Sequence, residues 1–219
     1  MIQCIDAGCV PYPRSLEWQR TLAEKRRNGD IQNHLLLLEH PPVYTFGRRN
    51  SSADLLIGTE KISKMGIKVY KTDRGGRITY HGPGQLVGYL IFTLKEPVPD
   101  FVWKIEESLL RLLEQYHLEG ERDEDHPGVW IGKRKIAAIG LHIERNVTTH
   151  GFSLNVNCDL KPFRYILPCG IPDRDVTSLE KELGWSPPMR DVKDRLSESF
   201  SDVFKTSVTL GANGPTQPE

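Results

Sequence analysis

The sequence has no excess of charge of either sign. Its 219 residues include 29 Lys and Arg and 29 Asp and Glu, which gives a formal net charge of zero. A balanced chain has no global field that would draw it to nucleic acid or to anionic lipid. We therefore expect neither a nucleic-acid partner nor a membrane partner, and any charged partner has to be recognised by a local patch.

Long apolar runs are also missing, and the first residues, MIQCIDAGCVPYPRS, lack the basic stretch and apolar core of a secretory signal. We expect a cytoplasmic protein whose four cysteines remain thiols. These cysteines form no C-x-x-C pair and the histidines show no metal-ligand spacing, so we expect no metal site. Cys4 and Cys9 are expected to be small buried hydrophobic residues.

Short, β-branched apolar runs alternate with a few helical patterns, which predicts an α+β fold with a mixed, largely antiparallel sheet flanked by helices. No repeat or linker divides the chain, so we expect one domain over residues 1–210. The Gly, Pro and polar residues at 211–219 predict a disordered tail. Strands are predicted at residues 3–7, 34–39, 67–70, 86–94, 128–131, 136–143 and 151–156, and helices at 13–27, from a cap at Asp100 to Tyr116, and after Pro188 to Val203.

The segment from Asp73 to Leu94 gathers four of its glycines around a short extended piece. The backbone N–H groups of such a loop can approach a ligand closely. A hairpin with glycine turns explains the same pattern equally well. Neither the dinucleotide fingerprint nor the phosphate-loop motif occurs in it, so it does not indicate a nucleotide site.

Two residues outside this segment are candidates for chemistry. Cys169 stands between Pro168 and Gly170, in a turn that can present its sulfur and backbone N–H groups to one point, as an oxyanion hole requires. Lys135 precedes a run of small apolar residues that leaves room either for an acyl chain or for tight packing. A lysine at a strand edge is more often a solvated charge, so neither residue is assigned by its spacing alone.

Four stretches in this order resemble one family closely: RGGRITYHGPGQL, KIAAIGLHI, THGFSLNV and FRYILPCGI, which span residues 74–171. HPPVYTFGRR at residues 40–49 is a weaker match. They are similar to the lipoyl(octanoyl) transferases, which have the biotin/lipoate protein ligase fold.

The resemblance implies that Cys169 carries the acyl group as a thioester and that Lys135 is its partner. One departure is Ser153, where the family commonly has alanine or a similar small residue, which affects the expected pocket wall but not the chemistry. The acyl chain and its carbonyl are expected to lie against Arg74, Gly75, Gly76, Arg77, Ile78, Thr79, Tyr80, His81, Ala138, Ile139, Gly140, Gly151, Phe152 and Ser153.

The resemblance also implies the reaction: octanoyl moves from octanoyl-acyl carrier protein to a lysine of lipoyl domains in 2-oxoacid dehydrogenases and the glycine cleavage H protein. This is the first step of endogenous protein lipoylation, and it needs no ATP or other cofactor. The acceptor lysine reacts as a neutral amine, and Lys135 is expected to accept or relay its proton. Because the partners are acidic, we expect a local basic docking surface at Arg48, Arg49, Arg74 and Arg77. Nothing in the sequence demands more than a monomer, so we expect one.

Three other functions fit parts of the pattern. The nearest is an ATP-dependent lipoate or biotin protein ligase of the same fold, which needs no cysteine nucleophile. A cysteine hydrolase would use His81 or His150 as its base, although neither stands in a recognisable protease signature. A non-catalytic protein that binds lipoyl or acyl-carrier domains would keep Cys169 as a buried thiol.

Overall fold

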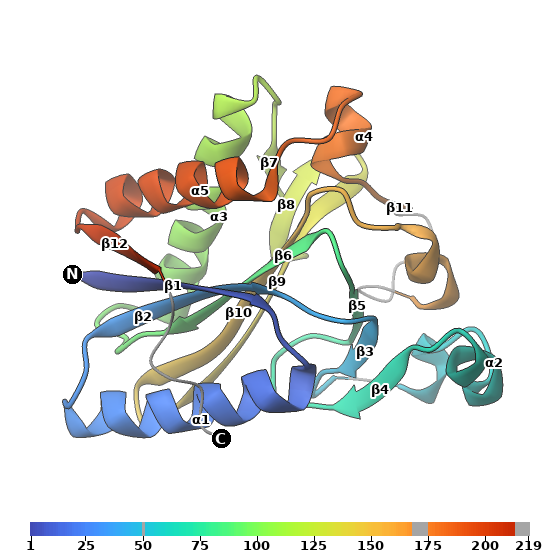
Figure 1. The fold of residues 1–219 in the computed structure, drawn as a ribbon, viewed down its shortest axis with the longest axis horizontal. Coiled ribbons are helices and arrows are strands. Elements are labelled where there is room, and N and C mark those ends of the chain that lie inside the picture. The colour runs from blue at the N-terminus through green and yellow to red at the C-terminus, as the bar shows by residue number, and fades with distance from the viewer. Residues whose placement is uncertain (50, 168–174, 213–219) are drawn as a thin grey trace.

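The computed structural model describes residues 1–49, 51–167 and 175–212, and within them the chain forms two sheets with helices around them (Figure 1). The larger sheet has nine strands in the order β12-β1-β2-β6-β10-β9-β8-β7, with β11 beside β9. Pairing is antiparallel from β2 to β7 and parallel for β12–β1, β1–β2 and β9–β11. Its strands are β1 (Ile2–Cys9), β2 (Asn33–Glu39), β6 (Gln85–Ile91), β7 (Glu121–Arg122), β8 (Gly128–Ile131), β9 (Arg134–Glu144), β10 (Val147–Asn155), β11 (Asp175–Val176) and β12 (Val208–Ala212).

Helices cover both faces of this sheet. α3 (Val98–Gln115) and α5 (Met189–Phe204) pack together on one face, α1 (Tyr12–Asn28) covers the other, and α4 (Leu179–Leu183) follows β11 (Figure 1). The four consecutive leucines of β2, residues 35–38, are all fully buried. A strand covered on both faces carries a continuous apolar run, because side chains pointing either way meet a core.

The second sheet, of order β4-β3-β5, belongs to a smaller layer that we call the small lobe. Tyr44 is fully buried at its centre and packs beside Tyr80, whose ring contacts Phe163 edge-on. This separate core holds the small lobe against the edge of the large sheet. The small lobe comprises β3 (Val43–Phe46), η1 (Ser52–Asp54), α2 (Thr59–Lys64), β4 (Lys68–Lys71), β5 (Ile78–His81) and η2 (Lys161–Tyr165).

The predicted α+β class and the mixed sheet flanked by helices are confirmed, two local expectations are wrong, and several short strands, β3 among them, are not predicted. The second long helix begins after Pro97, not at a cap on Asp100, because the fixed φ of proline suits the helix start. Strand β3 was missed because its four residues lie in a proline-flanked stretch. Cys9 is exposed at the end of β1, beyond the bulge at Gly8, so it is not a core residue.

The described residues contain no helix that is both long enough and apolar enough to cross a bilayer.

Candidate active site

A cavity of about 690 Å³ opens between the large sheet and the small lobe. Its wall comes from the loop before β5, from strands β5, β9 and β10, and from the start of α3 together with the loop before β8. Most of the residues that the sequence assigned to an acyl site meet here. The predicted residues in its lining are Arg74, Gly75, Gly76, Arg77, Ile78, Thr79, Lys135, Ala138, Ile139, Gly140 and Ser153.

A second cavity of about 50 Å³ adjoins the first, since both touch Ala138, Gly140 and Ser153. It brings in three more predicted residues, His81, Gly151 and Phe152, beside Tyr12 and Tyr89. Tyr80 points elsewhere: its ring packs against Tyr44 and Phe163 in the small-lobe core.

Arg74 fixes the glycine loop against the small lobe. Its guanidinium is buried and donates to the Thr45 backbone carbonyl and, at 2.9 Å, to the Thr45 hydroxyl, while another nitrogen donates to the Gly75 carbonyl at 2.9 Å. The loop also meets β9, where the Gly75 N–H donates to the Leu141 carbonyl and Gly140 has no room for a side chain. The expectation that Arg74 belongs to a docking surface is therefore wrong, because carbonyl and hydroxyl acceptors hold its guanidinium inside the protein.

Lys135 is buried in the wall of the main cavity, with 7% of its surface exposed, so it is not the solvated strand-edge charge that the bare pattern favours. Its ammonium donates to the Pro127 carbonyl at 3.1 Å and lies 4.5 Å from the centre of the Trp130 ring. A carbonyl oxygen and an aromatic face both attract a cation. β9, β8 and the loop before β8 together thus hold the Lys135 ammonium in the cavity wall.

Gly128 makes room for this ammonium. Its φ is +135°, and a Cβ placed there would lie 2.4 Å from the Ala137 carbonyl oxygen and 3.3 Å from the Lys135 Nζ. The Gly128 N–H donates to the Glu106 carboxylate at 2.8 Å. Burial raises the pKa of Glu106, and the Gly128 hydrogen bond, Arg122 and Lys135 oppose that rise.

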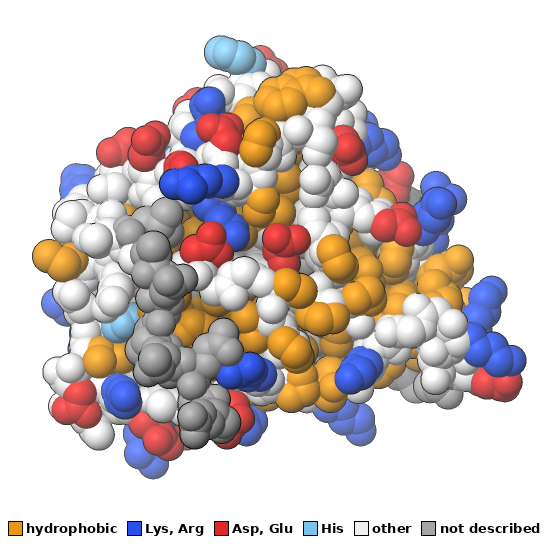
Figure 2. All heavy atoms as spheres, viewed as in Figure 1, with side chains coloured by type: hydrophobic (Ala, Val, Ile, Leu, Met, Phe, Trp, Pro, Cys, Tyr) orange, Lys and Arg blue, Asp and Glu red, His pale blue; other side chains and the backbone are white. Residues whose placement is uncertain are grey.

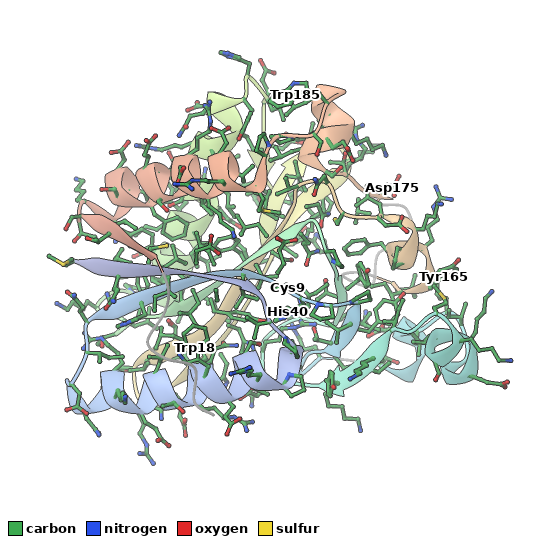
Figure 3. The ribbon with its side chains drawn as sticks, in the orientation of Figure 1. Cys9, Trp18, His40, Tyr165, Asp175 and Trp185 are labelled. Atoms are coloured by element: carbon green, nitrogen blue, oxygen red, sulfur yellow. The ribbon has the colours of Figure 1, made fainter. Side chains whose placement is uncertain are left out.

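The buried rings of His40 and His81 are in contact, and His81 lines the smaller cavity. Burial lowers the pKa of both. His81 gives its Nδ1 hydrogen to the Gln85 side-chain oxygen at 2.7 Å, and its pKa is well below the ordinary value. His40 donates from Nδ1 to the Val10 carbonyl and accepts from the Tyr89 hydroxyl, and its pKa falls to about 4. Figure 3 shows His40 above α1, close to the end of β1 where Cys9 lies. Both imidazoles are neutral near pH 7.

His150 belongs to a different pair, with its Nε2 2.8 Å from an Asp73 carboxylate oxygen. Burial lowers the pKa of His150 and the hydrogen bond to Asp73 opposes this, while the same bond lowers the pKa of Asp73. Within the described part of the chain, no three His, Cys, Asp or Glu side chains come together as a metal-ligating group.

Cys169 lies outside the described residues, but both neighbouring stretches are described. On one side, the Leu167 N–H donates to the Asp54 carbonyl of the small lobe at 2.9 Å. On the other side, β11 runs parallel to β9 with Val176 opposite Lys135, and the Thr177 N–H donates to the Lys135 carbonyl at 3.0 Å. The chain that follows Cys169 therefore returns to the strand that carries Lys135.

One wall of the main cavity is not indicated by any sequence pattern. This wall includes Val98 and Val102 at the start of α3 and residues 125–127, which precede β8. The valines look like part of an ordinary amphipathic helix, and the run of acidic residues before Pro127 looks like a solvated loop. No local pattern predicts that the start of α3 and the loop before β8 line the same cavity.

This combination of fold and cavity places the protein in the lipoate protein ligase fold class. A solved structure of a bipartite lipoate protein ligase from Thermoplasma acidophilum superposes with a TM-score of 0.74 at 16% identity, covering 99% of this chain and 88% of that one. At this identity the likeness concerns the fold alone.

Within that class, the model of the family "Lipoyl protein ligase A/B catalytic domain" matches residues 11–201, and the chain belongs to this family. An octanoyltransferase of Dictyoglomus turgidum is 49% identical over 195 residues, covering 89% of this chain and 84% of that protein. An octanoyltransferase of Alkaliphilus metalliredigens is 42% identical over 211 residues, covering 94% and 97%. The resemblance to the lipoyl(octanoyl) transferases and the transferase class are confirmed.

Proposed function

We propose that this enzyme transfers an octanoyl group from octanoyl-acyl carrier protein to a lysine of a lipoyl domain through a thioester on Cys169. The observation that carries the proposal is the buried Lys135 ammonium in the wall of the main cavity, on the strand that pairs with the chain after Cys169. The choice of octanoyl as the acyl group rests on the relatives that are named octanoyltransferase.

A lysine ammonium next to the Cys169 sulfur would stabilise its thiolate. A free thiol has a pKa of about 8.5, and half ionisation at pH 7 requires about 2 kcal/mol of stabilisation of the thiolate. An ammonium about 4 Å from the sulfur offers about 4 kcal/mol at an effective dielectric of about 20, before desolvation. One cation is sufficient, and Lys135 is the lysine that lines the cavity among the described residues.

The apolar part of the cavity suits a medium-length acyl chain. Ile78, Ala138, Ile139 and Phe163 contribute side chains to its wall. Burying the seven carbons beyond an octanoyl carbonyl is worth about 5 to 6 kcal/mol, at about 0.8 kcal/mol for each methylene. That is enough binding energy to hold the chain while its thioester reacts.

The basic surface of the small lobe suits an acidic donor. Residues 48–77 contain eight Lys and Arg against three Asp and Glu, in a chain with no net charge. Figure 2 shows basic side chains gathered at the corner formed by α2 and β4. Arg49 is exposed and also lines the cavity, so it joins this surface to the site. Its exposed basic side chains are Arg48, Arg49, Lys61, Lys64, Lys68 and Lys71.

Intact-mass analysis after incubation with octanoyl-acyl carrier protein, without ATP, tests the acyl-enzyme. Wild type is expected to gain one octanoyl group that maps to Cys169, and Cys169→Ala is expected to gain none. Cys9→Ser, which removes an exposed cysteine, should acylate normally. An adduct that persists in Cys169→Ala would refute the intermediate.

The pH dependence of alkylation by iodoacetamide tests the pair, in a Cys9→Ser background so that Cys9 does not react. Lys135→Ala should move the midpoint for Cys169 upward by about 1 to 2 pH units, because the thiolate loses its cation. The matched control is Lys133→Ala, since Lys133 is exposed in the turn between β8 and β9. An unchanged midpoint in Lys135→Ala would contradict the pairing.

A further inference from the structure

The backbone of His150 adopts a conformation that is rare in a strand. His150 lies within β10, yet its φ is +58°, in the left-handed region. A residue held there is strained, and the strain persists only where the surrounding structure fixes it. Strained residues of this kind cluster at binding and catalytic sites. His150 also lines the smaller cavity, so its contacts bear on the function of the site.

Buried side chains hold the backbone of His150 in this conformation. The Thr148 hydroxyl donates to the Leu90 carbonyl of β6 at 2.6 Å, and the regular pairing of β10 with β6 begins at Gly151. The His150 N–H donates instead to the side-chain oxygen of Gln19 at 2.7 Å. Gln19 is a fully buried residue of α1. The strained backbone is therefore fixed from two sides, by its own strand and by α1.

The imidazole of His150 reaches the start of the glycine loop. Its ring is buried, and its Nε2 lies 2.8 Å from one oxygen of the half-exposed Asp73 carboxylate. A carboxylate only accepts, so Nε2 carries the hydrogen and donates it to Asp73. Such a bond to a charged acceptor is stronger than one between neutral groups. His142 of β9 lies 3.7 Å from the other oxygen, which is too far for a hydrogen bond.

The loop that follows Asp73 connects the two lobes across the main cavity. Residues 74–77 all line that cavity. On the small-lobe side, backbone N–H groups of residues 47–49 donate to carbonyl groups of the loop. On the side of the large sheet, the Gly75 N–H donates to the Leu141 carbonyl of β9, and the Asp73 carboxylate accepts from the imidazole of β10. These bonds to β9 and β10 fix one wall of the cavity relative to the other.

We propose that His150 is a positioning residue, which through Asp73 holds residues 74–77 in the conformation that binds the acyl chain. The proposal rests on the function proposed above. Without the bond, the loop occupies that conformation for a smaller fraction of the time, and the apparent affinity for the acyl donor falls by the same factor. His150 makes and breaks no bond of the substrate. The loss therefore falls on KM and not on kcat, because a donor that has bound reacts as before.

Steady-state transfer from octanoyl-acyl carrier protein tests the bond. His150→Asn and Asp73→Asn should each raise the KM for the donor about tenfold, which corresponds to about 1.4 kcal/mol, and leave kcat unchanged. Asparagine tolerates a left-handed backbone, so His150→Asn keeps the fold of β10. The double variant should lose no more than either single one, because both remove the same bond. The matched control is His117→Asn, since His117 is exposed, has a φ of +57° and should leave KM unchanged.

Amide hydrogen exchange gives a second reading that does not depend on the reaction. In both variants the Gly75 N–H should exchange faster than in the wild type, while the buried residues 35–38 of β2 should exchange as before. Faster exchange in β2 as well would show a general loss of stability and overturn the proposal. Unchanged exchange at Gly75, additive losses in the double variant or a fall in kcat alone would also overturn it. If the wild type transferred no octanoyl, the proposed function would fail, and exchange at Gly75 would still decide whether the bond holds the loop.

Discussion

Gly128 offers a quantitative test of how tightly the Lys135 site is built. In Gly128→Ala the new methyl group would lie 2.4 Å from the Ala137 carbonyl oxygen, which is fixed within β9, and 3.3 Å from the Lys135 Nζ. The backbone angle of +135° is also unfavourable for alanine, at about 1 to 3 kcal/mol. Together, strain and overlap should destabilise the fold by about 3 kcal/mol or more.

The matched control is Gly132→Ala in the turn between β8 and β9. Gly132 also has a positive φ, +55°, but a Cβ there meets nothing within 4 Å, so only backbone strain of about 1 kcal/mol applies. For a chain of this size, 1 kcal/mol lowers the melting temperature by about 2 to 4 °C. Thermal unfolding should therefore give a loss of about 6 to 12 °C for Gly128→Ala and about 2 to 4 °C for the control.

A second measurement connects the packing to the chemistry. Because the methyl group displaces the Lys135 ammonium, Gly128→Ala should also raise the pH at which Cys169 is alkylated, whereas Gly132→Ala should not. Equal melting temperatures for the two variants would refute the close approach of Gly128 to the Ala137 carbonyl of β9. A large loss of stability with an unchanged alkylation profile would leave the packing intact and refute the role assigned to Lys135.

Two further outcomes are expected. The pKa of His40 is about 4 in the folded chain and about 6.5 in the unfolded chain, so only the unfolded state binds a proton between these values and stability falls as the pH falls. From pH 7 to pH 5 the stability lost is about 2 kcal/mol. Urea unfolding of His40→Gln should show a smaller loss over the same range. Arg49→Glu should slow acylation by octanoyl-acyl carrier protein about tenfold at low salt, and this effect should fade at high salt. Lys25→Glu on α1 should leave the acylation rate unchanged, and an equal effect of both substitutions would contradict docking on the small lobe.

Much of the fold follows from local patterns. The stripe from Phe101 to Tyr116 predicts a core helix, and the structure buries Phe101, Ile105, Leu109, Leu112, Leu113 and Tyr116 in one cluster. The alternation around residues 136–156 predicts two paired strands, and β9 and β10 form that pair. Such elements are predictable because side-chain periodicity alone decides which face is buried.

Other features depend on contacts between distant segments. β3 is too short and too close to prolines to be seen locally, and it exists because β4 and β5 flank it on both sides. Arg74 looks like a surface charge in the sequence, yet Thr45, in a strand not predicted, supplies the acceptors that hold it inside. The exposed Cys9 and the buried Cys4 stand in the same strand and cannot be told apart by residue type.

By itself, the sequence determined the family, the α+β class and eleven of the residues that line the main cavity, because long motifs in a fixed order preserve both the fold and part of its pocket wall. Only the tertiary structure decided what surrounds Lys135. Pro127 reaches it from the loop before β8, Trp130 from β8 and Glu106 from α3. The pairing of His126 with Asp123 depends on how that loop folds. The electrostatic environment of a side chain depends on distance in space, and sequence spacing does not give that distance.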